Sequence, residues 1–480
     1  MKVAVAGCCH GQLDKVFATL EHMERVEGVH VDLLLCCGDF QAARDETDLQ
    51  CMAVPAKYRH MHSFHKYYSG AQKAPVLTIF IGGNHEASNH LQEIPYGGWV
   101  APNIYYLGYA GIVKYGSLRI GGLSGIYNVH NYCKGHYEFP PYNNDTVRSV
   151  YHVRSCDVIK LKQIQQPLDV FLSHDWPRGI YNYGQREELL RRKRFLRNEV
   201  EANSLGSPAG AQLLHHLRPT FCRGLVMPNP RLQNSWPWTS AYLREISCRL
   251  AEHAVTKIHA KHETFTTLQT KKYKVTSQSV FMTKFSRIVV CNQVVEMLHD
   301  PEVPLQLEYD SEWLAILKTM DHLINVSPEI HAPSLKTENH LRHNYTLTKE
   351  AIATALSSLG RDLRVPQNFA KTVPDYGPHK PRAQDPKHAV NPQTTVFCAA
   401  LGIRDPNVVL NPELSTVLKE PHTGIVGKSV NNMEMHDQKS ELESRDGKVC
   451  ECVCLKQQSG IICSTNEDAN DILGESPPRA

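Results

Sequence analysis

The sequence lacks long apolar runs. None approaches the roughly 20 residues that a helix needs to span a bilayer. The apolar stretch Val3–Ala6 near the N-terminus is too short for the core of a signal peptide, and it leads directly into a polar Cys-Cys-His motif. We therefore expect no membrane contact. We also expect a reducing compartment, in which most of the fifteen cysteines are free thiols.

The sequence also lacks a strong charge of either sign. The formal net charge of +3 over 480 residues is too small to identify a nucleic-acid-binding protein. Any RNA-binding surface must therefore come from local clusters of side chains. Hydrophobic residues make up 41% and charged residues 21%, which is ordinary for a soluble globular protein. The length allows a sizeable core and two domains.

Apolar segments and loops alternate through the first half of the chain. Four segments are predicted to be buried strands, because each is short and apolar and ends at a turn or a polar loop: Lys2–Ala6, Val31–Cys36, Pro75–Ile81 and Asp169–Leu172. Asp14–Val26 has the periodicity of a helix. Three shorter strands, assigned to a second sheet, are predicted at Ile104–Tyr106, Ile112–Tyr115 and Leu118–Gly122. Ligands gather where the carboxyl ends of such strands meet.

The first two strands are each followed by side chains that suit a metal. In Gly7–Gly11 (GCCHG) the tight loop can aim Cys8 and His10 at one ion while Cys9 turns away. The alternative is a small apolar cysteine beside a surface histidine. After the second strand, Asp39 can bridge two cations with its two oxygens. Its alternative role is to cap a turn or a helix.

The third and fourth strands are followed by further candidate ligands. In Gly82–Glu86 (GGNHE) Asn84 offers a neutral oxygen ligand, and His85 is placed to act as a general acid. Glu86 is expected to orient His85 or a ligand. His174 supplies a nitrogen ligand after the fourth strand. The alternatives are a glycine turn with a capping asparagine, and an ordinary turn histidine.

Together these motifs resemble the calcineurin-like metallophosphoesterases. Most of that superfamily carries Asp where this chain has Cys8. This change, with four further motifs, makes the sequence similar to the RNA lariat debranching enzymes: GDFQ at Gly38–Gln41, GGNHEASNH at Gly82–His90, YGGWVAPN at Tyr96–Asn103 and SHDWPR at Ser173–Arg178. The resemblance covers Met1–Phe221, Gln293–Leu314 and Asn391–Ile403.

The resemblance implies an α/β fold, the four-layer α-β-β-α sandwich of the metallophosphoesterases with a small C-terminal domain and a disordered tail. We place the metallophosphoesterase domain at 1–221, a segment that departs from the family at 222–292, the C-terminal domain at 293–405 and the tail at 406–480. The Cys450, Cys452 and Cys454 cluster lies in that tail. We interpret these cysteines as incidental thiols.

The family's activity implies a function for these residues. Debranching enzymes hydrolyse the 2′–5′ phosphodiester bond at the branch point of excised intron lariats, and the linear RNA that results is turned over. By resemblance, Cys8, His10 and Asp39 would hold one divalent metal, and Asp39, Asn84 and His174 a second. His85 would protonate the departing 2′-oxygen. A thiolate ligand favours Fe²⁺, Zn²⁺ or Mn²⁺ over Mg²⁺. The nucleus would be the location, and spliceosome-associated proteins would be partners.

The family's lariat recognition loop maps to residues 124–154. Seven residues there are predicted to contact RNA: Tyr127, Tyr132, Lys134, His136, Tyr137, Tyr142 and Arg148. Aromatic rings interleaved with cations suit unstacked bases and phosphates. The alternative is a surface loop whose aromatics cover the core. Gln185–Val200 is predicted to be a basic helix, in which Arg191–Arg194 is either a phosphate contact, an import signal or a solvated face.

The sequence departs from the family after Phe221. The family's closing Ala-His-x-His motif should follow there, but Cys222–Pro228 contains no histidine. His259 and His262 are weak substitutes, because their spacing is His-x-x-His. We expect loss of this strand to disturb the sheet that positions His174. Three functions therefore remain open: a debranching enzyme, a lariat-binding protein or inactive splice form, and a protein or nucleotide phosphatase of the same superfamily.

Overall fold

A computed structural model describes residues 1–184, 186–219, 221–223, 273–274, 293–297, 299–329, 347–377 and 385–414. His259, His262, the three clustered cysteines Cys450, Cys452 and Cys454, and residues 415–480 of the expected tail lie outside these ranges. Residues 1–417 group into one compact unit. Within the described ranges no helix is long and apolar enough to cross a membrane.

The first sheet is built around four parallel strands. They are β1 (Lys2–Ala6), β2 (Leu33–Cys36), β3 (Leu77–Phe80) and β5 (Ile104–Tyr106). The sheet order is β10-β11-β1-β2-β3-β5-β4, with β4 (Gly98–Ala101), β10 (Tyr273–Lys274) and β11 (Gln293–Met297) antiparallel to their neighbours. The predicted strand Ile104–Tyr106 thus belongs to the first sheet and not to the second.

The second sheet has the order β12-β6-β7-β8-β9. Its strands are β6 (Ala110–Tyr115), β7 (Leu118–Leu123), β8 (Val170–Ser173), β9 (Phe221–Arg223) and β12 (Leu307–Tyr309). β9 pairs in parallel with β8, from Val170 opposite Phe221 to Leu172 opposite Arg223. The strand that the sequence departure put in doubt is therefore present, so the expectation of its loss was wrong. Backbone pairing does not require the family's side chains here.

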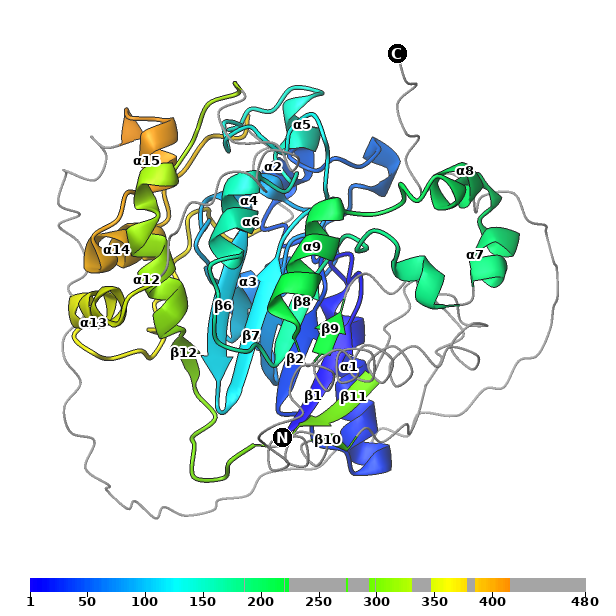
Figure 1. The fold of residues 1–480 in the computed structure, drawn as a ribbon, viewed down its shortest axis with the longest axis horizontal. Helices are drawn as coiled ribbons and strands as arrows, with labels where there is room; N and C mark the ends of the chain where they lie inside the picture. The colour runs from blue at the N-terminus through cyan, green and yellow to red at the C-terminus, as the bar shows by residue number, and fades with distance from the viewer. Residues whose placement is uncertain are drawn as a thin grey trace, which may run out of the picture. The chain divides into compact units, whose positions relative to one another are not determined.

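The two sheets face each other across an apolar core, and helices cover their outer faces (Figure 1). Leu35 and Ile79 of the first sheet share this core with Ile120 and Leu172 of the second. Outside the first sheet lie α1 (Leu13–Glu27) and α3 (Phe64–Ser69), and outside the second lie α6 (Ser155–Leu161), α9 (Pro208–Leu217) and α12 (Ser311–Thr319). The predicted four-layer α-β-β-α sandwich is confirmed.

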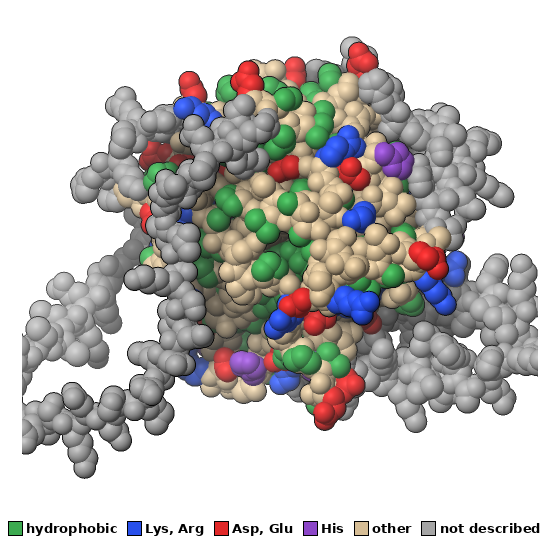
Figure 2. Space-filling model, turned by 90° about the vertical axis from the view of Figure 1, so that its left-hand side faces the viewer, with side chains coloured by type: hydrophobic (Ala, Val, Ile, Leu, Met, Phe, Trp, Pro, Cys, Tyr) green, Lys and Arg blue, Asp and Glu red, His purple; other side chains and the backbone are tan. Residues whose placement is uncertain are grey.

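The C-terminal region shares this core. β11 pairs with β1, and β12 pairs with β6, so residues after 293 extend both sheets. Helices α12, α13 (Lys349–Ser358) and α14 (Pro392–Leu401) gather beside β6 and β12 (Figure 1). A further helix, α15 (Pro406–Leu410), lies where the tail was expected to begin. Figure 2 views this side and shows acidic and basic side chains interspersed among its described residues.

The basic segment after residue 185 is not one helix. α7 (Arg186–Arg192) ends at Lys193, whose φ of −123° and ψ of 71° lie outside the helical region. A 3-10 turn and α8 (Arg197–Glu201) follow. Arg191 and Arg192 both bond to Glu188 within α7, which neutralises part of the basic run.

Candidate metal centre

The predicted ligands meet at the carboxyl ends of four strands. Cys8 and His10 follow β1, Asp39 follows β2, Asn84 follows β3, and His174 follows β8. The first three of these strands are parallel neighbours in one sheet, so their following loops lie at one edge. His174 reaches this edge from the second sheet. The structure therefore brings together the five side chains that the sequence proposed as ligands.

One group consists of Cys8, His10 and Asp39, whose potential ligand atoms all lie within 4.8 Å of one another. Backbone bonds join the two loops: the N–H of His10 donates to the carbonyl of Asp39 at 2.7 Å, and that of Gly11 to Phe40 at 2.9 Å. Both loops are strained, because His10 and Asp39 adopt φ values of 45° and 49°. The tight bonding holds that conformation and directs the three side chains inward.

Two neighbours of this group support its geometry. The side-chain amide of Gln41 lies 3.0 Å from His10 Nδ1 and orients the ring, a role that the sequence analysis did not predict. Cys9 is buried among the residues packed against α1, and its thiol is directed to the carbonyl of Gly7. Cys9 thus turns away as expected. Cys8, Cys9 and Cys36 are free thiols.

A second group forms around His174. Its Nδ1 lies 2.9 Å from the carbonyl of Cys37, to which it donates, so Nε2 of the neutral ring carries a lone pair. That Nε2 lies 3.1 Å from Asn84 Oδ1 and 3.3 Å from Asp39 Oδ1. With the His174 ring neutral, these three atoms are electron-pair donors that converge without a hydrogen between them. Such an arrangement fits a divalent cation, and Asp39 belongs to both groups, as a bridging ligand would.

The charges of these groups depend on one another. Burial raises the pKa of Asp39, but His174, His85 and His10 outweigh that effect and hold the pKa of this carboxylate well below its usual range. Burial and the charge of Asp39 raise the pKa of the Cys8 thiol well above its usual range. Cys8 must lose its proton to bind a metal as a thiolate, so metal affinity should rise with pH.

His85 lies beside Asp39 and outside the two ligand groups. Its backbone N–H donates to Asp39 Oδ1 at 2.9 Å, and its Nδ1 lies 3.2 Å from Asp39 Oδ2. Burial lowers the pKa of His85, but the hydrogen bond to Asp39 and the charge of that carboxylate outweigh burial and raise it above 6.5. The raised pKa favours the protonated form of His85, which is the form that a general acid requires.

Glu86 was expected to orient His85 or a ligand, and its bonds lead to the ligand loops and not to the ring of His85. Its carboxylate instead accepts three backbone N–H groups, from Phe40 and Gln41 at 2.8 Å each and from Gly83 at 2.9 Å. Burial and the charge of Asp39 raise the pKa of Glu86 to about 7, although the three donors favour the charged form. Glu86 thus ties the loop that carries Asp39 to the loop that carries Asn84 and His85.

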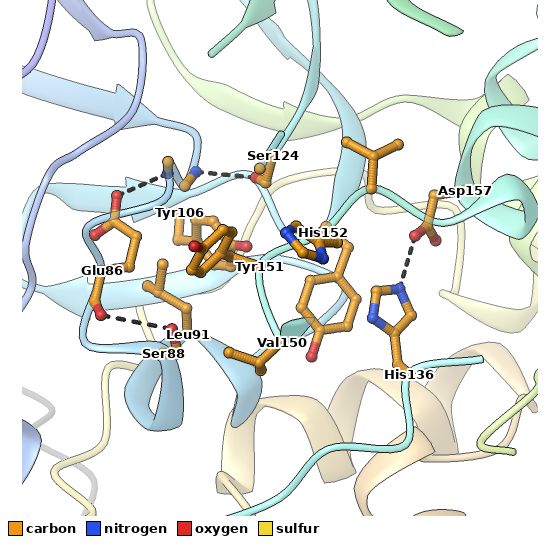
Figure 3. Close-up of a pocket in the computed structure, with 15 residues that line it drawn as sticks. Glu86, Ser88, Leu91, Tyr106, Ser124, His136, Val150, Tyr151, His152 and Asp157 are labelled. Carbon is orange, nitrogen blue, oxygen red and sulfur yellow. Dashed lines mark hydrogen bonds and ion pairs between the residues drawn. The ribbon is translucent and has the colours of Figure 1, made fainter. Parts of the chain in front are cut away.

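The recognition loop contributes to a pocket next to this edge (Figure 3). The pocket is lined by Gly83 and Glu86 from the glycine turn and by His136, Tyr151 and His152 from the recognition loop. The base of the loop is fixed to the glycine turn, because the N–H of Gly82 donates to Ser124 Oγ at 3.0 Å. Neither Tyr151 nor His152 was among the predicted site residues, because buried loop residues have no distinguishing sequence pattern.

The seven predicted RNA contacts occupy different environments. Tyr132 is buried in the core and so presents no open ring. Tyr142 donates its hydroxyl to Gln92 at 2.6 Å, and His136 bonds to Asp157 at 2.8 Å. Tyr142 and His136 are half-buried, as are Tyr127, Lys134 and Tyr137, and Arg148 is exposed. The alternative of aromatic cover for the core therefore describes part of this loop, and RNA contact by the seven residues stays a prediction.

Two buried histidines near the site predict sensitivity to acid. Burial and the charge of Arg44 lower the pKa of His90 to about 4, and burial and the charge of Arg154 lower that of His152 to about 3. Both values lie below the 6.5 of an unfolded histidine, so the unfolded chain binds more protons as the pH falls. The contribution of each neutral histidine to the free energy of unfolding is fully present above pH 6.5. It decreases as the pH falls from 6.5 towards the folded-state pKa of about 4 for His90 and about 3 for His152. Each histidine should reduce the free energy of unfolding by about 2 kcal/mol at pH 5.

Urea unfolding at pH 7.5 and pH 5 measures this effect. His152→Asn removes the titrating ring, so the difference between the two pH values should shrink by about 2 kcal/mol. His30→Asn is the control, because the His30 side chain is 70% exposed. A pH difference that is the same in both variants would show that His152 is not the source.

Whether His259 and His262 replace the closing histidines of the family stays a prediction. The described residues of β9 end at Arg223, and the next described residues are Tyr273 and Lys274. His259 and His262 therefore lie outside the described residues.

Known proteins resemble this chain at both ends. The family model of the calcineurin-like phosphoesterases matches residues 1–202, and that of the lariat debranching enzyme C-terminal domain matches residues 284–406. The lariat debranching enzyme of Homo sapiens is 52% identical over 417 residues, which cover 85% of this chain and 70% of the human protein. That of Danio rerio is 52% identical over 412 residues, which cover 84% of this chain and 66% of the relative.

The lariat debranching enzyme of Mus musculus is also 52% identical over 412 residues, covering 85% of this chain and 70% of its own length. Similarity of this extent reaches both sheets and the C-terminal helices. With the strand-end ligands in place, these relatives show that the chain belongs to the lariat debranching enzyme family, a metal-dependent branch of the calcineurin-like phosphoesterases.

Proposed function

We propose that this protein hydrolyses the 2′–5′ phosphodiester bond at the branch point of excised intron lariat RNA. The observation that carries the proposal is the convergence of Cys8, His10 and Asp39 opposite Asn84 and His174, in a chain whose relatives are named lariat debranching enzymes. The cysteine distinguishes this centre from that of most metallophosphoesterases. We propose Fe²⁺, Zn²⁺ or Mn²⁺ as the metals, because a thiolate ligand favours softer ions.

The protein's own residues supply orientation and a proton. Asp39 reaches both ligand groups and also accepts the backbone N–H of His85. When bound, divalent ions activate water and neutralise the charge that develops on the phosphate. His85 engages Asp39 through Nδ1, which leaves Nε2 as the nitrogen that donates a proton to the departing 2′-oxygen. Because the pKa of His85 is raised, the ring holds this proton to a higher pH than an ordinary histidine does.

A turnover assay on the purified full chain tests the proposal. Branched RNA with one 2′–5′ linkage, linear 3′–5′ RNA and a phosphopeptide would be offered in parallel with added Mn²⁺. We expect cleavage of the branched RNA alone. Cleavage of the phosphopeptide and not of the branched RNA would contradict this proposal and would indicate a phosphatase of the same superfamily.

A second candidate function is lariat binding without cleavage. The observation in its favour is the departure from the family sequence after Phe221, where the closing histidines should stand. Metal content after purification separates the two: two ions per chain favour the enzyme. Tight binding of branched RNA with no bound metal and no turnover favours the binding protein.

His85 should control the alkaline side of the pH profile. We expect His85→Ala to lower turnover of branched RNA by roughly 10²–10⁴-fold, which is the usual contribution of a general acid. In the unsubstituted chain turnover should fall as the pH rises through the raised pKa of His85. That fall should be missing in the variant.

A change of leaving group provides the control for His85. A p-nitrophenyl phosphodiester needs little help from a proton, so the variant should lose far less activity on it. An equal loss on both substrates would mean that His85 maintains the structure of the site and does not donate the proton.

The nucleus and spliceosome-associated proteins follow from the proposed substrate. We propose the basic run Arg191–Arg194 as the import signal, although Arg191 and Arg192 are paired with Glu188. Imaging of a tagged chain with Arg191 and Arg192 changed to alanine tests it, and nuclear accumulation equal to that of the unchanged chain would remove the signal from this run.

A further inference from the structure

A buried ionic cluster lies at the far ends of two of the loops that carry candidate ligands. Arg44 and Asp48 are each 1% exposed, and Glu93 is 3% exposed. Arg44 donates through Nε to Asp48 at 2.9 Å and through Nη1 to Glu93 at 2.7 Å. Buried ionised groups are retained only when all their bonding positions are filled. The partners of this cluster must therefore stay in place.

The cluster links the segments that follow two of the ligand positions. Arg44 lies five residues after Asp39, and Glu93 follows helix α4 (Ser88–Gln92), which begins shortly after Asn84 and His85. Two more bonds join the same segments: Asn89 donates to Asp48 at 2.6 Å, and His90 Nδ1 donates to the carbonyl of Ala42 at 2.9 Å. The spacing of Asp39 from Asn84 and His85 thus depends on how closely these segments pack.

One member of the cluster comes from the C-terminal region. The hydroxyl of Thr372 accepts a hydrogen bond from Arg44 Nη1 and donates one to Glu93 Oε2, both at 2.6 Å. Thr372 is itself held by Tyr68, whose hydroxyl accepts the backbone N–H groups of Thr372 at 2.9 Å and of Val373 at 3.0 Å. A hydroxyl more than 270 residues away in sequence thus bridges the cation and the anion that join the two ligand segments.

We propose that Thr372 is a positioning residue for the metal centre, through which the C-terminal region sets the spacing between the loop of Asp39 and the loop of Asn84 and His85. Without the hydroxyl, the bond left to Glu93 Oε2 among the described residues is the one from the amide of Asn391, at 3.5 Å. An under-bonded buried carboxylate is costly, so α4 and the loop before it would shift to recover partners. The effect of Thr372 on turnover rests on the proposed function, but its effect on the packing of the two loops does not.

Hydrogen exchange of the full chain, measured by mass spectrometry, tests this inference without metal or RNA. Thr372→Val keeps the shape of the side chain and removes the hydroxyl, and Thr372→Ser keeps the hydroxyl. We expect Thr372→Val to speed exchange in peptides covering 39–48 and 84–93 by about 10-fold, as local opening does. Thr372→Ser should restore slow exchange. Peptides covering β6 and β7 should not change in either variant.

Mn²⁺ affinity is the second readout. Loss of a direct partner of a metal ligand typically costs roughly 10–100-fold. Because Thr372 acts on the ligand loops through Arg44 and Glu93, we expect Thr372→Val to weaken Mn²⁺ binding by about 10-fold, the lower end of that range, and Thr372→Ser by little. Thr354→Val is the matched control, because the Thr354 hydroxyl donates to the carbonyl of Glu350 within its own helix, α13. If Thr372→Val fails to fold, Glu93→Gln disturbs the same bridge and takes its place.

The outcomes separate this inference from the proposed function. Unchanged exchange at both loops in Thr372→Val, or equally faster exchange in all peptides, would overturn the positioning role. If the unsubstituted chain cleaves no branched RNA while the loop-specific exchange effect is present, the proposed function fails and the positioning role stands.

Discussion

Asp39→Asn is expected to reduce Mn²⁺ affinity and turnover of branched RNA by roughly 100-fold or more, since even partners outside the ligand set contribute roughly 10–100-fold. Asp39 has ligand atoms in both groups, at 3.3 Å from His174 Nε2 and within 4.8 Å of the atoms of Cys8 and His10. An asparagine amide offers one oxygen, not two, and carries no charge. Without the charge of Asp39 the pKa of His85 also falls, so the substitution weakens both metal binding and the supply of the proton.

Isothermal titration with Mn²⁺ and single-turnover cleavage measure these two losses. Asp45→Asn is the matched control, because Asp45 caps α2 (Glu46–Gln50) through its Oδ1 and asparagine caps a helix equally well. If Asp39→Asn binds Mn²⁺ as tightly as Asp45→Asn does, the bridging position of Asp39 is wrong.

The local sequence predicted the sheets and their ligand loops well. Short apolar strands that end in a turn or a polar loop specify both the strand and the point at which it stops, so β1, β2, β3 and β8 were found close to their bounds. Parallel pairing then places their following loops at one edge. Cys8, Asp39, Asn84 and His174 could therefore be placed together before any contact was known.

Contacts between distant segments were beyond the reach of sequence patterns. Ile104–Tyr106 has the composition of any buried strand, and only its pairing with β3 shows which sheet it joins. Glu86 was expected to orient His85 or a ligand, and only its bonds to three backbone N–H groups show that it joins the two ligand loops. Thr372 has no local signal at all, because its function depends on Arg44 and Glu93.

In the recognition loop, too, the sequence predicts the kinds of side chain present but not which of them are buried. Its aromatic and basic composition suits RNA, but composition does not separate a ring that faces solvent from one that fills a core. Tyr132 packs with residues of α6 and α12, whereas Arg148 is exposed. Long irregular loops lack the periodicity that assigns a face to each side chain, so the predicted contacts in this loop need a structure to sort them.

Gly83→Ala should disrupt the metal centre strongly, although the substitution adds only one methyl group. A Cβ at Gly83 would lie 2.3 Å from Asp39 Oδ1, 2.4 Å from the Asp39 nitrogen and 2.8 Å from His174 Cε1. None of these atoms can move without displacing a ligand, so we expect Mn²⁺ affinity to fall by roughly 100-fold. Overpacking of a tight site usually also costs about 1–3 kcal/mol of stability. Titration with Mn²⁺ and urea unfolding measure both effects.

Gly82→Ala is the matched control on the neighbouring residue. Its Cβ would approach Leu91 Cδ1 at 3.3 Å and Ser124 Cβ at 3.5 Å, and the end of a leucine side chain can yield by a few tenths of an ångström. We therefore expect Mn²⁺ affinity within a few-fold of the unsubstituted chain. Because the two variants add the same methyl group to the same turn, a difference between them reports the contact with Asp39 and His174. Equal Mn²⁺ affinities in the two variants would mean that the ligand loops can separate at Gly83 without loss, and that their close approach there is not needed to hold the metals.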